Sequence, residues 1–156
     1  MWWQWWLFLH LAGVLAFVGA HGVSTFVLFR IRKERNRQRI AELIAFSGTS
    51  TRPMYIALIV LVVGGVGAGI TLHLFSAWWL WISIAILLLT IGLMSALAAP
   101  YFRRITAACE VRPSGVPRVS DEELEQLLRS REAGVIAAIG GIGLLAILYL
   151  MLFKPF

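Results

Sequence analysis

Residues 54–75 read MYIALIVLVVGGVGAGITLHLF and contain no Asp, Glu, Lys or Arg. A helix of about 20 apolar residues crosses the hydrocarbon core of a bilayer, so this run is long enough to span it. Three further runs have the same character, at residues 5–29, 77–99 and 133–153. A helix satisfies its own backbone hydrogen bonds in lipid. The four runs therefore predict an all-α, four-helix transmembrane bundle that forms one domain over residues 1–156.

The composition excludes a soluble globular protein. Hydrophobic residues make up 60% of the chain and charged residues only 14%, with a mean hydropathy of +0.82, whereas soluble domains carry about 25% charged residues. The single cysteine, Cys109, excludes an internal disulfide and a thiolate metal cluster. The net charge of +6 does not indicate a nucleic-acid partner, because the basic residues are confined to the connections between spans.

The distribution of charge predicts how the chain is threaded. Residues 30–53 and 100–132 hold 13 of the 14 basic residues and all eight acidic ones. By the positive-inside rule both segments face the cytoplasm, which leaves both termini outside. The seven tryptophans fall at the opposite end of the spans as one interfacial belt: Trp2, Trp3, Trp5, Trp6, Trp78, Trp79 and Trp81. We therefore expect a multi-pass protein of the bacterial cytoplasmic membrane, with membrane lipids as partners of its basic residues.

The two long connections contain helical signals of their own. Residues 36–46 carry apolar residues at helical spacing, which predicts a short amphipathic helix on the inner membrane surface, ended near Gly48. Pro100 is expected to open an irregular segment. Ser120 and Glu123 then form a capping-box pattern, and no proline follows, so the fourth helix is predicted to run unbroken over residues 120–153.

Small residues recur at spacings that allow helices to approach closely. Gly65 and Gly69 form a GxxxG pair in the second span, and Gly140 and Gly141 lie in the fourth. Three explanations stay open at this stage. These faces pack the bundle internally, or contact another subunit or a second copy of the chain, or leave room for a flat cofactor.

Three histidines are the candidates for chemistry, because the spans hold no Asp, Glu, Lys or Arg. An ionisable residue within the membrane is costly and is a functional hypothesis by default. His10 and His73 are expected at similar depth, because the first two spans are antiparallel. His21 lies deeper without a partner histidine and is expected to donate a hydrogen bond to a hydroxyl such as that of Thr90. A zinc or copper site at these residues is a weaker interpretation, since no carboxylate or thiolate reaches this depth, and the same lack excludes a Ser–His–acid hydrolase.

Two imidazoles that face each other across a bundle can supply both axial ligands of a haem iron. The sequence therefore predicts a b-type haem between His10 and His73 as one interpretation of the pair. Gly13 lies one turn from His10, and Gly65 and Gly69 precede His73 at intervals of four, so all three could leave room for the ring. The alternative is that both histidines are structural and hydrogen-bond to neighbouring oxygens.

Several short motifs carry a resemblance to a known family. LHLAG at 9–13, GAHGVS at 19–24, the Phe29-Arg30 exit with its basic cluster and FKPF at 153–156 resemble a bacterial family of integral membrane proteins of unknown function. The chain is more distantly similar to CopD-like copper-resistance membrane domains and to the four-helix bacterial protoporphyrinogen oxidase, which also begin with a Leu-His pair. In the oxidase the early histidine is associated with haem, and the resemblance implies that role for His10. This sequence has no Lys or Arg within its spans to match the rest of that enzyme's site.

Three classes of function are compatible with these features. The first is an accessory subunit of a larger energy-transducing membrane complex, favoured by the small size, the glycine-rich faces and the lack of a complete catalytic set. The second is a haem-b electron carrier or membrane oxidoreductase, which overlaps the first. The third is a copper-handling or transport protein, although the spans lack the buried charge pairs or broken helices typical of transport sites.

Overall fold

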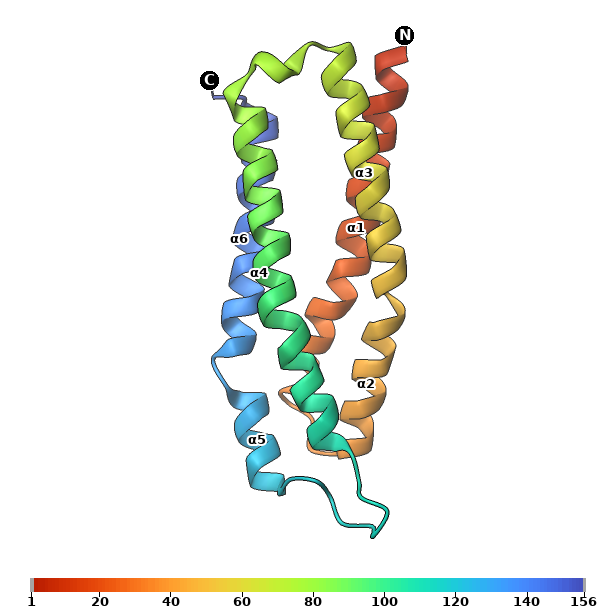
Figure 1. Ribbon diagram of the computed structural model, residues 1–156, viewed down its shortest axis with the longest axis vertical. Helices are drawn as coiled ribbons and strands as arrows, with labels where there is room; N and C mark the ends of the chain where they lie inside the picture. The colour runs from red at the N-terminus through yellow and green to blue at the C-terminus, as the bar shows by residue number, and fades with distance from the viewer. Residues whose placement is uncertain (1, 156) are drawn as a thin grey trace.

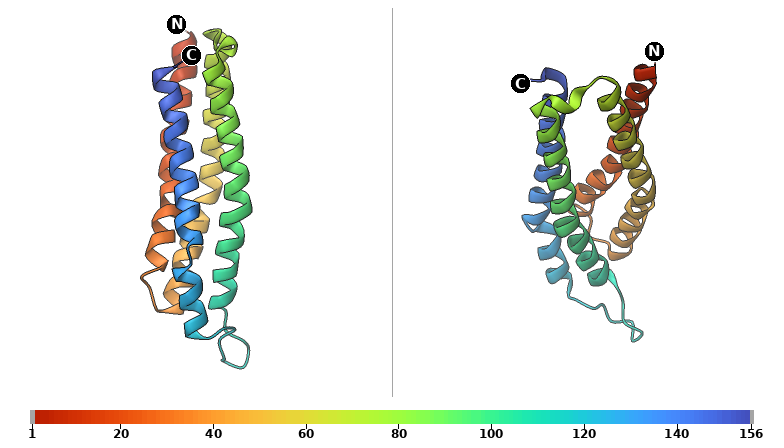
Figure 2. Two further views of the ribbon diagram at one scale, coloured as in Figure 1. Left: turned by 90° about the vertical axis from the view of Figure 1, so that its left-hand side faces the viewer. Right: turned by 45° about the horizontal axis from the view of Figure 1, so that its top comes forward.

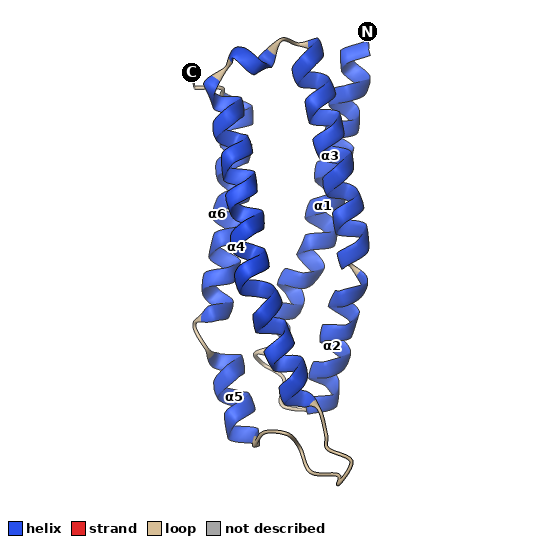
Figure 3. Ribbon diagram, viewed as in Figure 1, coloured by secondary structure: helices blue, strands red, loops and turns tan. Residues whose placement is uncertain are grey.

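The computed structural model describes residues 2–155, and within them every regular element is a helix (Figure 3). In chain order these are α1 (Trp2–Ile31), α2 (Arg37–Thr49), α3 (Thr51–Thr71), the 3-10 turn η1 (Leu74–Ser76), α4 (Trp78–Cys109), α5 (Asp121–Arg129) and α6 (Glu132–Phe153) (Figure 1). Four helical stretches are long and apolar enough to cross a membrane: α1, α2 with α3, α4, and α5 with α6. The predicted all-α four-helix bundle is confirmed.

The bundle consists of two antiparallel helix pairs. α1 packs along α3, and α4 packs along α6 (Figure 1, Figure 2). α1 starts and α6 ends at the same end of the bundle, where α4 also follows η1. We call this the tryptophan end, because α1 and α4 begin there with the seven tryptophans. The opposite end, with α2, α5 and residues 110–120, is the charged end.

The largest group of buried apolar side chains lies at the charged end. It joins the last turns of α1, α2, the end of α4, α5 and the start of α6, and includes Val27, Leu28, Ile31, Ile40, Tyr101, Ile105, Leu124, Leu128, Ala133 and Ile136. The predicted amphipathic helix is confirmed as α2, which is capped by Asn36, whose side chain accepts a hydrogen bond from the Arg39 amide at 3.1 Å. Its placement differs from the prediction, since α2 lies below α3 along the bundle and buries Ile40 in this core (Figure 1).

Two predicted boundaries were wrong. α3 ends at Thr71 and does not reach Phe75; His73 follows with a left-handed backbone, φ 54°, and η1 completes the connection to α4. Pro100 does not end the third span, because α4 continues through it to Cys109. A proline removes one helical donor, but the turns beyond it bury Ile105 and Ala108 in the charged-end core, which stabilises the continued helix.

The fourth span is not one unbroken helix as predicted. Ser120 caps α5 as expected, with its hydroxyl accepting from the Glu123 amide at 3.2 Å. The chain then leaves the helical conformation at Ser130, where ψ is 153°, and α6 begins at Glu132. The break lets α5 direct Leu124 and Leu128 into the charged-end core while α6 follows α4.

Candidate functional site at the interface of α1 and α3

α1 and α3 approach so closely that glycine is required at their contacts. A Cβ atom built on Gly13 would lie 2.5 Å from the backbone nitrogen of Leu61. One built on Gly64 would overlap the backbone of His10, and one on Gly67 would overlap the ring of Trp6. Small residues permit this kind of backbone approach between helices in lipid. The glycines of α3 are thus used for packing within the chain.

His10 is held inside this interface by a specific hydrogen bond. Its Nδ1 lies 2.7 Å from the carbonyl oxygen of Leu61 on α3. A carbonyl only accepts, so Nδ1 carries a proton and donates this hydrogen bond. The ring also lies against Gly65, where a built Cβ would be 2.9 Å from Nδ1. This is the orientation in which protein histidines bind metals through Nε2, and equally that of a structural interhelical hydrogen bond.

His73 does not share the level of His10, contrary to the prediction. His10 contacts α3 at Leu61 to Gly65, and α3 continues for about 9 Å beyond Gly65 before it ends at Thr71. His73 follows that end on an exposed turn.

The glycines expected to leave room for a haem ring are covered by protein. Gly13 lies against the Leu61 backbone, Gly65 against the His10 ring, and Gly69 against the ring of Phe75, which would be 3.0 Å from a built Cβ. Trp6 fills the position over Gly67 between the levels of the two histidines. The residues therefore do not fit a haem held between His10 and His73 in this arrangement.

His21 lies where the two helix pairs meet. Its ring stacks on Phe17 with a centroid separation of 5.7 Å and an interplanar angle of 4°. A Cβ built on Gly140 of α6 would lie 3.5 Å from His21 Nε2 and 3.8 Å from the sulfur of Met94 on α4. Thr90, the expected partner, instead lies against Gly143. His21 thus packs against Gly140 of α6, which also lies beside Met94 of α4.

The described residues, 2–155, hold no group of three or more His, Cys, Asp or Glu side chains that could bind a metal ion. The sequence singled out His10 as a candidate ligand, but it missed the Leu61 carbonyl as its hydrogen-bond partner. The partner follows from the register of α1 against α3, which the structure supplies and which places Gly13 beside Leu61 and His10 beside Gly64.

Comparisons with protein families, with curated proteins and with solved structures find no match to this chain. The resemblance noted from the sequence motifs therefore stays a prediction.

Proposed function

We propose that this protein is a non-catalytic subunit of a larger membrane complex, and that a transmembrane helix of a partner packs on helix faces that the chain leaves open. The observation that carries the proposal is the incomplete closure of the bundle. Each helix pair is tightly packed within itself, but the pairs contact each other mainly at the charged end and through α1 and α6. Toward the tryptophan end the two pairs stand apart, joined by the segment that contains η1 (Figure 1).

The glycines of α1, α3, α4 and α6 support the proposal because they fall into two groups. Those of one group are covered within the chain: Gly13, Gly64, Gly65, Gly67, Gly69, Gly140 and Gly143. The other group lies within α1, α4 and α6 with nothing within 4 Å of a built Cβ: Gly19, Gly22, Gly92, Gly134 and Gly141. Such positions let the backbone of another helix approach. The predicted contact of the Gly140–Gly141 face thus divides, with Gly140 packed internally and Gly141 available to a partner.

The same proposal places the protein in the bacterial cytoplasmic membrane, with the charged end in the cytoplasm. It draws its support from the positive-inside rule and from the tryptophans gathered at the other end. No reacting group is required of the chain in this role. His10 then stabilises the α1–α3 pair, and His21 fixes the point where the two pairs meet.

The test is the size of the assembly in native membranes. The membranes are solubilised in mild detergent, and the mass of the complex that contains the 17.4 kDa chain is measured on native gels. We expect wild type to run as a hetero-oligomer. Gly141→Leu should shift the chain to its monomer mass, because a large side chain on an open face blocks a neighbouring helix without touching the internal packing.

Ile142→Leu is the matched control, because Ile142 is the next residue, is 67% exposed and changes only in shape. It should leave the assembly intact. A wild-type chain that runs as a monomer would refute the subunit role, and an oligomer of this chain alone would replace it with self-association. If both variants dissociated the complex equally, the open glycine would not be the contact.

A further inference from the structure

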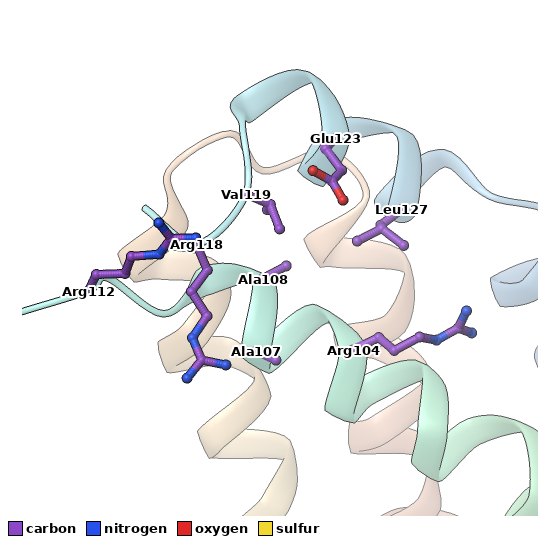
Figure 4. Close-up of a pocket in the computed structure, with 8 residues that line it drawn as sticks. All are labelled: Arg104, Ala107, Ala108, Arg112, Arg118, Val119, Glu123 and Leu127. Atoms are coloured by element: carbon purple, nitrogen blue, oxygen red, sulfur yellow. The ribbon is translucent and has the colours of Figure 1, made fainter. Parts of the chain in front are cut away.

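The charged end carries a basic pocket of about 690 Å³. It lies between α4, α5 and the segment that joins them (Figure 4). Arg104, Arg112 and Arg118 contribute to its wall, and Ala107 and Leu127 are among its apolar lining residues. Positive charge over an apolar floor is the chemistry of a site for an amphipathic anion.

The connecting segment is ordered in a way that fixes two of these arginines. Its arms pair through a bridge between Val111 and Pro117. The Arg112 amide donates to the Val116 carbonyl at 2.9 Å, and the Arg118 amide donates to the Glu110 carbonyl at 3.0 Å. Gly115 closes the turn with φ 77°, a conformation that favours glycine. Arg112 and Arg118 therefore leave the two arms of one tight hairpin.

The three arginines retain donors for a ligand. Arg104 pairs with Glu132 and Arg118 with Glu110 at 3.1 Å, but their side chains remain 50% and 56% exposed. Arg112 makes no ion pair with any residue in 2–155.

One carboxylate, that of Glu123, also lines the pocket. Figure 4 shows Glu123 on α5, away from the guanidinium groups of Arg104 and Arg118, which extend on either side of Ala107. The wall formed by α4 and the hairpin is thus positively charged.

An apolar track leads from the membrane to the pocket. Leu89, Leu93 and Leu97 precede Arg104 on one face of α4, and they are 62%, 37% and 39% exposed. α4 is also the least buried of the four apolar helical stretches. An acyl chain along this face would bring its headgroup to Arg104, whereas a free phosphate would make no use of the track.

We propose that the pocket of Arg104, Arg112 and Arg118 binds the phosphate of an anionic phospholipid headgroup, whose acyl chain lies along Leu89, Leu93 and Leu97. The arginines donate hydrogen bonds to the phosphate oxygens, and Ala107 and Leu127 contact the glycerol end of the chains. The site does not depend on the partner helix, because none of the open glycines proposed for that contact lines the pocket.

The experiment titrates the detergent-solubilised full chain with short-chain phosphatidylglycerol, and with phosphatidylcholine of the same chain length, and counts bound lipid by native mass spectrometry. We expect phosphatidylglycerol to bind more tightly than phosphatidylcholine. Arg112→Gln, Arg118→Gln and Arg104→Gln should each weaken phosphatidylglycerol binding by about fivefold, the effect of one basic residue near an anionic headgroup. Inorganic phosphate should not displace the lipid.

Arg103→Gln is the matched control, since it removes the same charge one residue from Arg104 but outside the pocket. It should leave the affinity unchanged. Arg112→Gln breaks no ion pair, so its result stands even if the other two variants lose stability. Equal loss with Arg103→Gln, equal binding of the two lipids, or displacement by inorganic phosphate would each overturn the proposal.

Discussion

At His10 one ring nitrogen is committed to the Leu61 carbonyl across the α1–α3 interface. His10→Ala should therefore lower the free energy of unfolding by about 1 kcal/mol, which lies between the average and the largest values for one interhelical hydrogen bond in a membrane protein. His73→Ala, on an exposed turn, should have little effect. Reversible unfolding in mixed detergent measures both. A haem-ligand pair would instead give matching losses together with loss of a Soret band, so equal effects with such a band would contradict the structural role.

Arg37 connects three elements at the charged end. Its guanidinium donates to the Ala108 carbonyl at the end of α4 at 2.8 Å, to the Val119 carbonyl at 2.7 Å and to Asp121 at the start of α5 at 2.8 Å. Its side chain is 14% exposed. Arg37→Ala should lower the free energy of unfolding by about 2 kcal/mol, because charged hydrogen bonds are lost and two carbonyls lose their partner. Arg37→Lys should retain only part of this stability, since an ammonium group lacks the planar fork of donors of a guanidinium.

The control for Arg37 is Arg35→Ala, whose side chain is 81% exposed and makes one ion pair at 3.6 Å. It should change the stability by less than about 0.5 kcal/mol. Thermal unfolding in detergent compares the variants, and an Arg35 loss as large as that of Arg37 would show that net charge, and not this geometry, matters.

Glu34 predicts a pH dependence in the turn between α1 and α2. Its carboxylate accepts from the Arg35 amide at 3.0 Å and the Asn36 amide at 3.2 Å, and these bonds, chiefly that from Asn36, lower the pKa of Glu34. Because the pKa of Glu34 is lower in the folded state, the stabilisation from these hydrogen bonds is complete above the pKa of the unfolded chain. It is lost as the pH falls through the pKa of the folded state. Carbon NMR should find the Glu34 carboxyl titrating below a glutamate in an unstructured peptide; an unshifted midpoint would contradict the bonds.

The candidate site could be predicted only in part from the sequence. His10 stood out because a histidine within a span is costly. Its expected pairing with His73 failed because relative depth depends on where α3 ends, and hydropathy continues through Phe75 although the helix ends at Thr71. Leu61 acts through its backbone, so its residue type gave no signal.

Substitutions of glycines in α3 and α6 distinguish packing inside a helix pair from contacts with other helices. Gly64→Ala should lower the free energy of unfolding by about 2 kcal/mol, because the new methyl group overlaps the His10 backbone and forces α1 and α3 apart. Gly141→Ala, with nothing within 4 Å, should not destabilise the isolated chain. Unfolding in mixed detergent reads out both variants. The close approach of the helices would be refuted if the two variants were equally stable.

At the level of elements, apolar length and charge were sufficient to predict four spans, and helical spacing was sufficient for α2. Prolines and glycines were less informative about where the helices end. Pro100 lies inside α4 because tertiary burial of Ile105 and Ala108 outweighs one missing donor, and α5 separates from α6 without a proline or glycine at Ser130. The helix breaks there because α5 and α6 pack against different partners. The amphipathic pattern of the sequence does not show which partner each segment contacts.

The whole molecule combines a closed end with an open one. The charged end is held by a shared apolar core and by ion pairs such as Arg37–Asp121 and Arg104–Glu132, whereas the tryptophan end relies on two separate helix pairs. Because lipid tails are as apolar as leucine, burial does not drive the pairs together in a membrane. The helices of such a bundle are held mainly by contacts within each pair, which is compatible with the partner helix proposed above.

Orientation is the remaining property of the whole molecule that can be tested directly. The charged end holds 13 of 14 basic residues, so positive-inside bias predicts that it faces the cytoplasm while Trp2 and the C-terminus face outside. Figure 1 places the start of α1 and the end of α6 at the tryptophan end, and α2 and α5 at the other. Phe156 itself lies outside the described residues.

The test uses single-cysteine variants made after Cys109→Ala, a change at a small buried position. A membrane-impermeant thiol reagent added to intact cells should label Trp2→Cys but not Arg35→Cys or Glu123→Cys, and permeabilised cells should label all three. The two charged-end positions come from different connections, so a single misplaced loop would be detected. Labelling of position 35 or 123 in intact cells would show that the orientation is the reverse of the predicted one. The proposed headgroup pocket would then lie in the opposite leaflet.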